Sequence, residues 1–560
     1  MSDMKNFIGR LLLGAVVVST SLMGPVANAA VPGITGWSGT STTSASFDLN
    51  AAEGYTSQPD GASIYTWGYG CNSTPGFLPN SVGTSQGANC PSMQLPGPTM
   101  IVNQGDTVTV TLTNNLPAAA GNTSILFPGF SVTSTGGSPG ILTQEAPNVS
   151  CLAAGGAASC NKVTYTFVAT TPGTHSYYSG TQSDLQIELG LYGALIVRPT
   201  LSGGTVSGGS GTVPGGYAKG ANMPDTCVAL NAKLARAFGA DTEYRLSSAA
   251  YDNPATCYDR EYLFQFAEMD PRIHTQAQAQ AAAPCAVATG CMVVDTEPYR
   301  SAYFLINGRS MPDDMDANYA SQYPNQPYNG NPHMHPGELT LVRIIGQGRM
   351  QHPFHEHGNH LRLLARDGNL LLSKSVGSNS LAGPLLFTTT TTPGMTLDAI
   401  YQWTAKGLNW DVYGHHDQDA NNAATPDDCI ADANGYYTSV AAAPNYYEWC
   451  GDHKKPLESK PFGNVGSNGP VTLPDANIVV NGAWYGGSPY LGPEATGRAV
   501  GATPIPPSGT VANSPTDEAG FGFMWHSHNE REITTNNIFP GGMMMLMLVD
   551  PWTFSINESN

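Results

Sequence analysis

Alternation of polar and apolar residues is the feature that most limits how this chain folds. Residues 107–112 read TVTVTL, and Asn114-Asn115 follows as a typical turn. A period of two places the apolar side chains on one face of a β-strand, and several such strands separated by turns predict a β-sandwich. Further strand-like segments lie at 163–168, 192–197, 261–266, 303–306, 339–345, 360–364, 396–403, 522–525 and 543–549. We therefore expect an all-β fold.

The composition supports a loop-rich β protein rather than a helical bundle. Only 12% of the residues are charged, whereas the chain has 64 Gly and 42 Pro. A short helix is expected at 230–238, and the Ala/Gln run at 276–283 is either a helix or a loop. The formal net charge of −19 argues against nucleic acid and anionic membrane surfaces as partners.

Histidines gather in two dense groups, and each group contains a His-x-His pair. Residues 350–360 read MQHPFHEHGNH, and FMWHSHNERE lies near the C-terminus. On a strand, the two histidines of a pair point to the same face. The pairs are His355 with His357 and His526 with His528, and His352 points to the other face of its strand.

Two such pairs in a chain of only 13 histidines predict one metal site. Imidazole is a suitable ligand for copper, zinc, iron and nickel. The alternative is a chance cluster of surface histidines, which explains one pair more easily than two. No cysteine lies near either pair, so a thiolate ligand is not expected.

The N-terminus has the pattern of a signal peptide over residues 1–29. Lys5 and Arg10 precede an apolar stretch at 11–24, and Ala27-Asn28-Ala29 supplies small residues for cleavage. We therefore expect an exported protein, periplasmic or extracellular. No later stretch reaches the roughly 18 to 20 apolar residues of a membrane helix, so no membrane span is expected.

Ten cysteines follow the signal peptide, and an even number in an exported chain predicts disulfides. Proximity in the sequence suggests one set of pairs, although other connectivities stay open. The suggested pairs are Cys71–Cys90, Cys151–Cys160, Cys227–Cys257, Cys285–Cys291 and Cys429–Cys450.

Changes in composition suggest two domains. The first covers 31–200, and a Gly/Ser-rich linker and loop region covers 201–254. The second covers 255–552 and contains an insertion at about 404–515, where strand signals are few. The alternative is three domains. The oligomeric state stays open.

Several segments resemble the multicopper oxidase family, in the order in which that family has them. They are PGPTMIVNQGDTVTVTLTNNLP at 96–117, GLYGALIVRP at 190–199, FLINGR at 304–309, HPGELTLVRIIGQGRMQHPFHEHG at 335–358, and WHSHNERE with the later GGMMM. The resemblance implies a multicopper oxidase-type architecture of cupredoxin-like Greek-key β-sandwich domains, with copper as the cofactor.

The copper-ligand motifs of that family are degenerate here. The first two motifs align with 126–129 and 177–180, which contain no histidine, whereas the third is intact from His352 to His357. In the fourth motif, Ser527 stands at the blue-copper cysteine and Glu532 stands at the later histidine. A blue-copper site requires a thiolate, so we expect this chain to lack one.

The leading hypothesis is an exported copper-binding oxidoreductase with a mononuclear or reduced copper site. His355, His357, His526 and His528 would bind the metal, and His352 would lie behind them as a supporting or vestigial ligand. Glu532 would move protons, and the substrate would be a small molecule or a metal ion. The alternatives are a non-catalytic copper-binding protein for storage or resistance, and a structural surface protein with vestigial sites.

Three other groups of metal-ligand residues have simpler interpretations. His333-Met334-His335 and His415-His416 are interpreted as polar loops, and the methionines at 543–547 as strand core. Glu356 lies between His355 and His357, so we expect it to point away from them.

Overall fold

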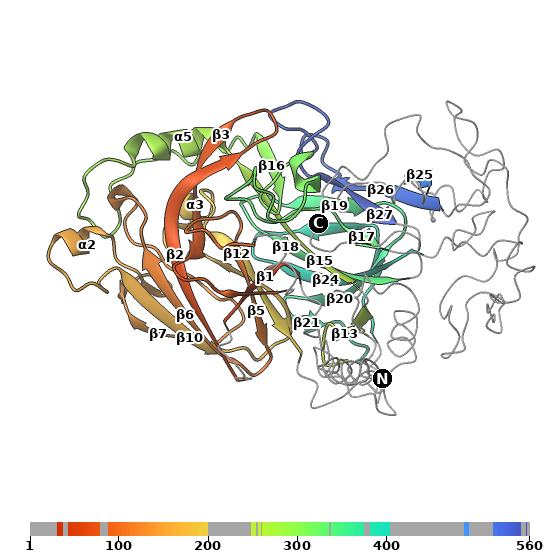
Figure 1. Ribbon diagram of the computed structural model, residues 1–560, viewed down its shortest axis with the longest axis horizontal. Helices are drawn as coiled ribbons and strands as arrows, with labels where there is room; N and C mark the ends of the chain where they lie inside the picture. Colours follow the sequence, from red (N-terminus) through yellow and green to blue (C-terminus); the bar gives the residue numbers. More distant parts are fainter. Residues whose placement is uncertain are drawn as a thin grey trace, which may run out of the picture.

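In the computed structural model, the alternating segments form strands of four large sheets, beside two short two-stranded ones. Figure 1 shows these strands with their labels. The structure describes residues 31–36, 43–78, 88–199, 248–253, 256–258, 260–334, 338–374, 381–403, 487–491, 519–549 and 556. The expected signal peptide, most of the expected linker, the helix expected at 230–238 and most of the expected insertion therefore lie outside the described residues. The all-β fold is confirmed.

Two five-stranded sheets form the first sandwich. One sheet has the order β11 (Gly173–Tyr178), β12 (Tyr192–Arg198), β5 (Gly97–Asn103), β1 (Gly33–Thr35), β4 (Gly76–Leu78). The other has the order β3 (Ser63–Cys71), β2 (Ser44–Ser57), β6 (Thr107–Asn114), β10 (Lys162–Val168), β7 (Thr133–Gly136). The alternation on β6 places Val108, Val110 and Leu112 in the core that the two sheets share, together with Trp67 and Met100.

Two larger sheets form the second sandwich. The seven-stranded sheet contains β16 (Tyr303–Ile306), β15 (Arg260–Met269), β18 (Leu339–Gly346), β24 (Thr396–Gln402), β20 (Leu361–Arg366), β21 (Asn369–Leu370) and β22 (Leu385–Leu386). The six-stranded sheet contains β17 (His333–Met334), β27 (Met544–Val549), β26 (Ala519–Ser527), β19 (His352–Glu356), β23 (Thr388–Thr391) and β25 (Gly487–Leu491). Phe264 and Tyr401 from the first of these sheets meet Phe354 and Trp525 from the second in one buried core.

Shared apolar clusters fix the order of the four layers. Ile101 on β5 and Ile196 on β12 pack with Leu263 on β15 and Ile345 on β18. The β11-containing sheet therefore lies against the seven-stranded sheet, and the six-stranded sheet covers the far side of the seven-stranded one. We call this six-stranded sheet the outer sheet. The two-domain boundaries themselves stay a prediction.

Buried polar groups also join the two sandwiches. Arg343 on β18 forms ion pairs with Glu261 (2.8 Å) and with Asp398 on β24 (3.4 Å). Asp398 accepts hydrogen bonds from the backbone N–H (3.1 Å) and hydroxyl (2.5 Å) of Thr174, which lies on β11 in the first sandwich. Tyr251 donates to the same carboxylate.

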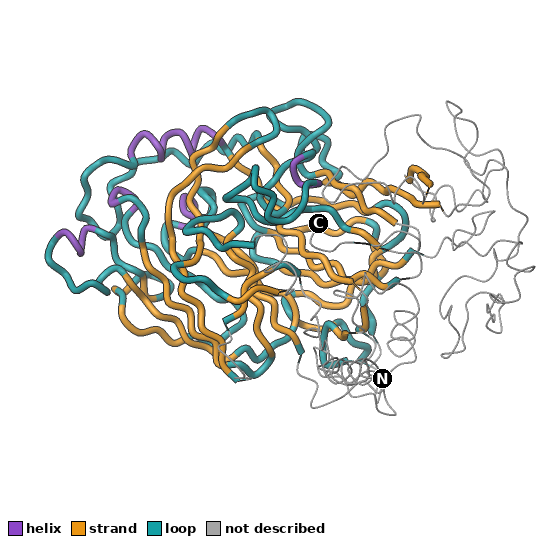
Figure 2. Tube along the Cα trace, viewed as in Figure 1, coloured by secondary structure: helices purple, strands orange, loops and turns teal. Residues whose placement is uncertain are grey.

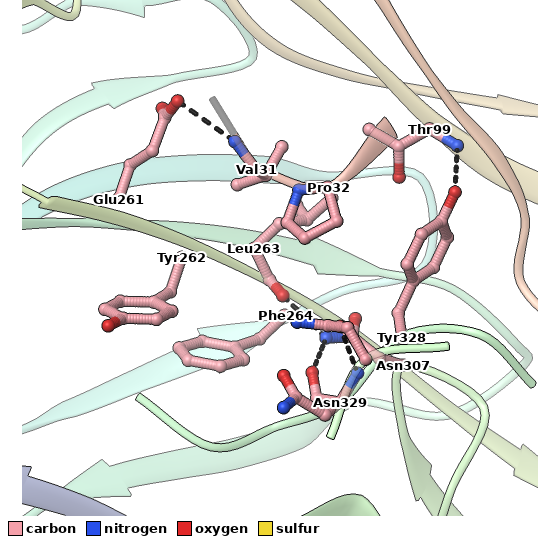
Figure 3. Close-up of a pocket in the computed structure, with 11 residues that line it drawn as sticks. Val31, Pro32, Thr99, Glu261, Tyr262, Leu263, Phe264, Asn307, Tyr328 and Asn329 are labelled. Carbon is pink, nitrogen blue, oxygen red and sulfur yellow. Dashed lines mark hydrogen bonds between the residues drawn. The ribbon is translucent and has the colours of Figure 1, made fainter. Parts of the chain in front are cut away.

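A cavity of about 30 Å³ lies at this seam, with room for roughly one or two water molecules (Figure 3). Its walls come from the N-terminal segment, β5, β15 and the loops near Asn307 and Tyr328. Within it, the Val31 backbone N–H donates to Glu261 and the Thr99 backbone N–H donates to the Tyr328 hydroxyl. The residues that line it include no histidine, so it is separate from the predicted metal site.

Helices are few and short, as Figure 2 shows. They are η1 (Ala118–Ala120), α2 (Ser150–Ala153), α3 (Ser183–Gln186), α5 (Pro271–Gln280) and η2 (Asp313–Met315). Asp270 caps α5 by accepting from the Arg272 backbone N–H, and Pro271 suits its first turn. The Ala/Gln run therefore belongs partly to a helix. Two short pairings, β8 (Ser138–Pro139) with β9 (Gln144–Glu145) and β13 (Ser248–Ala249) with β14 (Cys257–Tyr258), complete the strands.

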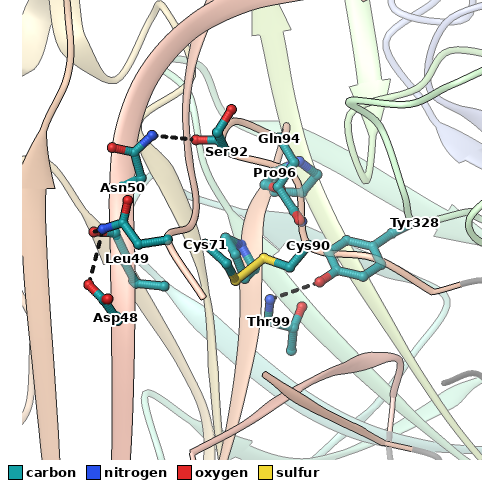
Figure 4. The surroundings of a disulfide bond; sticks show 12 residues. Asp48, Leu49, Asn50, Cys71, Cys90, Ser92, Gln94, Pro96, Thr99 and Tyr328 are labelled. Carbon is teal, nitrogen blue, oxygen red and sulfur yellow. Dashed lines mark hydrogen bonds between the residues drawn. A yellow bond between two sulfur atoms is a disulfide. The ribbon is translucent and has the colours of Figure 1, made fainter. Parts of the chain in front are cut away.

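Three of the expected disulfides are present and confirm those pairs: Cys71–Cys90, Cys151–Cys160 and Cys285–Cys291. The first links the end of β3 to the segment that leads into β5, and the neighbouring Asn50 side chain donates to the Ser92 carbonyl (Figure 4). The other two expected pairs involve residues outside the described part of the chain. Among the described residues, no helix is both long and apolar enough to cross a membrane.

Candidate metal centre

The two His-x-His segments lie side by side because β19 and β26 pair in the outer sheet. The strands are antiparallel, and their register places His355 opposite His526 and Phe354 opposite Ser527. Side chains alternate along a strand, so neighbouring residues point to opposite faces of the outer sheet. Phe354 and Trp525 enter the buried core, and His355 and His526 therefore point to the other face of the outer sheet.

Three imidazoles converge on that face. One ring nitrogen from each of His355, His357 and His526 lies within 4.8 Å of the other two. The Nε2 atoms of His357 and His526 are 3.3 Å apart. Two nitrogens bound at ~2.0–2.1 Å to one tetrahedral ion are separated by roughly 3.3 Å. This spacing therefore fits two ligands of a single ion.

His528 lies beside the three converging imidazoles. Its ring centroid is 4.9 Å from that of His355 and 5.5 Å from that of His526. It is exposed, whereas His355 and His526 are buried and His357 is partly buried. We call these four residues the imidazole cluster. Its His528 side is open to solvent, so a bound ion would be accessible from outside.

Hydrogen bonds occupy the Nδ1 atoms of two cluster residues. The Nδ1 atom of His355 lies 2.7 Å from the Thr388 hydroxyl oxygen, and that of His526 lies 2.7 Å from the Ser527 carbonyl oxygen. The Ser527 carbonyl can only accept, so His526 Nδ1 carries the proton and its Nε2 keeps a lone pair. Such partners behind a ligand fix its tautomer and orientation.

Burial favours the neutral form of two rings in the cluster. Burial, together with the nearby His526 and His528, lowers the pKa of His355 to about 4. Burial also lowers the pKa of His526. Metal ions bind the neutral ring, so these two imidazoles are already in the binding form at neutral pH.

His352 lies on the opposite, core side of β19. Its Nε2 is 2.9 Å from Glu268 Oε2 on β15, and its Nδ1 is 2.8 Å from Glu532 Oε2. Burial alone would lower the pKa of His352, but the hydrogen bonds and charges of both carboxylates raise it to about 9. In its protonated form the ring donates from both nitrogens, one to each carboxylate.

Glu532, the predicted proton carrier, also lies on the core side. Its carboxylate accepts from the Ser527 hydroxyl (2.5 Å) and the Asn529 amide (2.8 Å), in addition to its contact with His352. These bonds place it behind the end of β26 rather than among the rings of His526 and His528. A role for Glu532 in proton transfer stays a prediction.

His333 and Met334 form the buried strand β17, so the polar loop expected there is wrong. Two further residues of the third motif region also lie outside the cluster. His360 packs its ring against the exposed Phe387, which also contacts His355. Glu356 points to the core side and accepts from the Thr389 hydroxyl (3.1 Å). His335, His415 and His416 lie outside the described residues.

Two residues of the site had no recognisable signal in the sequence. Glu268 reaches His352 from a strand 84 positions earlier, and Thr388 belongs to a run of five threonines with nothing to distinguish it. Only the pairing of strands from distant parts of the chain brings them to the histidines.

The first sandwich contributes no histidine at the positions of the degenerate motifs. Leu126 and Tyr178, one from each segment, are paired through their backbones. The nearby His175 is buried, bonds to the Thr171 carbonyl (2.9 Å) and packs against Phe130. Within the described residues, the imidazole cluster therefore comes from β19, β26 and the turns that follow them.

Comparisons with known proteins match part of the chain to one family. Residues 83–202 match the family described as multicopper oxidase. A solved multicopper oxidase, mgLAC, is similar at a TM-score of 0.40 and 14% identity, covering 91% of this chain and 87% of its own. The blue copper oxidase from Nitrosomonas europaea is similar at a TM-score of 0.39 and 13% identity. The match covers 90% of this chain and 85% of that oxidase.

The copper nitrite reductase from Nitrosomonas europaea is also similar, at a TM-score of 0.33 and 17% identity, covering 64% of this chain and 84% of its own. Likenesses this distant carry no argument about activity. No curated protein sequence matches the chain.

Proposed function

Residues 83–202 belong to the multicopper oxidase family, and on this premise we propose that the chain is an exported copper-binding oxidoreductase with one copper centre, the imidazole cluster. The observation that carries this proposal is the convergence of ring nitrogens from His355, His357 and His526 within 4.8 Å. Imidazole is a good ligand for copper. The disulfides support the expected export, because such bonds persist in oxidising compartments.

The chain's own residues would bind the ion, orient the rings and supply a ligand on the solvent side. His355, His357 and His526 would hold the ion from one side, and Thr388 and the Ser527 carbonyl would keep two of the rings oriented. The exposed His528 would complete the set on the solvent side. Bound there, copper would supply one-electron chemistry between its cuprous and cupric states.

Access from solvent favours an oxidoreductase over a storage protein. A storage site is best closed around its ion, whereas a substrate must reach a reacting one. The exposed ring of His528 and the exposed Phe387 (54%) lie at the edge of the cluster. A small molecule or a metal ion is the class of substrate that such an opening admits.

Metal retention tests the proposed centre directly. After copper loading and dialysis, wild-type protein should keep about one copper per chain. His357→Ala combined with His528→Ala removes one ligand from each pair and should abolish retention. The control is His415→Ala with His416→Ala, which changes two histidines that are consecutive in the sequence. We expect no copper at these residues, so this variant should behave as wild type. Equal copper in all three proteins would refute the centre.

The absorption spectrum provides a second test. Ser527 has no thiolate to donate to copper, so the loaded protein should lack the intense visible band of a blue-copper site. Turnover of a phenol or a reduced metal ion, lost in the His357/His528 double variant, would separate an oxidoreductase from a storage protein. An intense blue band in pure wild-type protein would contradict the assignment.

A further inference from the structure

A second buried cluster lies directly behind the imidazoles, on the core side of the same two strands. It consists of Glu268, His352, Ser527 and Glu532, and we call it the clasp. His352 lies between the two carboxylates, at 2.9 Å from Glu268 and 2.8 Å from Glu532, and Ser527 donates to Glu532 at 2.5 Å. All four side chains are buried.

The geometry of the clasp does not suit a metal ion. Each ring nitrogen of His352 is already hydrogen-bonded to a carboxylate, and the two nitrogens lie on different edges of the ring. Glu268 and Glu532 therefore lie on different sides of the imidazole and cannot share one ion with it. Ser527 offers a hydroxyl group, which donates to Glu532. The residues at the position of a blue-copper centre thus form a closed hydrogen-bonded set.

The clasp joins the segments that carry the cluster imidazoles. Glu268 also accepts from the backbone N–H groups of Arg349 (2.7 Å) and Met350 (3.0 Å), which lead into β19. His352 itself begins β19, the strand of His355. The start of β19 is therefore fixed to β15.

Glu532 fixes the end of the other strand. It returns from the turn after β26 and accepts from Ser527, the last residue of β26, and from Asn529 in the turn. The intervening His528 donates its backbone N–H to Pro353 on β19 (2.7 Å). The positions of His526 at the end of β26 and of His528 in the turn thus depend on where Glu532 is held.

We propose that the clasp takes no metal and instead positions the metal centre, by setting the separation between the His355–His357 pair and the His526–His528 pair. This positioning role depends on the proposed function only for the identity of the bound ion. His352 and Glu532 are positioning residues, because they act on the cluster through the two strands. Ser527→Cys alone should therefore produce no blue-copper band, since both nitrogens of His352 remain bonded to carboxylates.

The test compares two variants of the clasp with a matched control. Glu532→Gln and Glu268→Gln keep the side-chain size and remove one carboxylate each. The matched control is Glu338→Gln, which removes the partner of Arg260 in a fully buried ion pair. Glu338 lies in the same sandwich, directly before β18. For each variant, we would measure the melting temperature and the copper affinity by chelator competition. Electron paramagnetic resonance would give the copper hyperfine splitting.

We expect both clasp variants to fold, to bind copper roughly tenfold more weakly and to show altered hyperfine splitting. Glu338→Gln should lower the melting temperature and leave the copper signal unchanged. Folded clasp variants with unchanged affinity and splitting would overturn the proposal. A second copper in wild type that His352→Asn removes without disturbing the first would also overturn it.

A measurement without metal separates this proposal from the proposed function. In metal-free protein, Glu532→Gln should speed hydrogen exchange of the turn at 528–532, and Glu338→Gln should not. If wild type binds no copper but the turn loosens in Glu532→Gln, the proposed function fails and the positioning role stands. An unchanged exchange rate in Glu532→Gln would refute the positioning role.

Discussion

At the scale of single residues, two histidines of β19 have pKa values that are shifted in opposite directions. His355 and His352 are three positions apart on β19, yet the pKa of the first is lowered to about 4 and that of the second is raised to about 9. Burial favours the neutral ring in both. Only His352 has two carboxylates beside it, and they reverse the shift.

The lowered pKa of His355 should keep this ring available to a metal ion in mildly acidic solution. An unperturbed imidazole competes with protons for metal below about pH 6.5. Because burial and the neighbouring rings lower the pKa of His355 to about 4, protonation of this ring should weaken copper binding only in more acidic solution. An NMR titration of the His355 ring in metal-free protein checks this. A titration midpoint near pH 6.5 for that ring would contradict it.

The raised pKa of His352 predicts a loss of stability in alkaline solution. Its folded-state pKa of about 9 exceeds the unfolded value of about 6.5, so its contribution is complete below pH 6.5 and disappears as the pH rises through 9. The contribution is on the order of 3 kcal/mol. Unfolding by urea at pH 6 and pH 10 measures it. His352→Gln should remove most of this pH dependence, and an unchanged slope in that variant would refute the assignment.

At the scale of strands and turns, the turn after β19 determines where His357 lies. The carbonyl of His357 accepts from Tyr401 (3.2 Å) and Trp525 (3.0 Å), and Gly358 follows with a φ of +95°. A Cβ on Gly358 would lie 2.3 Å from the Tyr401 hydroxyl oxygen and 2.9 Å from the Phe523 ring. The turn therefore requires glycine for its conformation and for its close packing.

Gly358→Ala should lower the melting temperature and weaken copper retention together, because the clash moves the backbone that presents His357. Gly61→Ala is the matched control. Gly61 has a similar φ of +85°, but no atom lies within 4 Å of its added Cβ. Gly61→Ala therefore has the backbone strain of Gly358→Ala without the clash. Copper retention equal to wild type in a folded Gly358→Ala protein would contradict this prediction.

Strand alternation explains why much of the fold was predictable. The TVTVTL segment forms β6, and the apolar runs near 339–345 and 543–549 form β18 and β27. β2 was not identified, because SASFDLNAAEGYTS contains Asn, Glu and Gly where a strand pattern requires branched or aromatic residues. Its pairing on both sides stabilises it instead.

The site was predictable to the extent that it depends on alternation. The spacing of His355 and His357 placed both on one face, away from His352 and Glu356. The antiparallel pairing that brings His526 to His355, and the approach of Glu268 to His352, depend on tertiary contacts between distant segments. Local sequence has no information on these contacts.

At the scale of the whole molecule, buried charges bind the two sandwiches together. Asp398 on β24 accepts from Thr174 on β11 and pairs with Arg343. Removing one partner of a buried ion pair leaves the other charge uncompensated, which costs about 3–5 kcal/mol. Asp398→Ala should destabilise the protein by about this amount in urea unfolding.

The control for Asp398→Ala is a solvent-exposed pair. Glu297, whose side chain is 69% exposed, pairs with Arg349 at 2.6 Å. Exposed pairs contribute about 0–1 kcal/mol, so Glu297→Ala should cost little. Similar losses in the two variants would show that the seam does not depend on Asp398.

The two faces of β19 also determine how this protein can evolve. Substitutions at positions 355 and 357 act on the imidazole cluster, and substitutions at 352 and 354 act on the clasp and the core. Selection can therefore change or discard the metal chemistry by point mutation while the sheet persists. Insertion or deletion of one residue within β19 would turn every later side chain to the opposite face. Descendants of this chain should therefore vary more readily at positions 355 and 357 than at 352 and 354, and should keep the length of that strand.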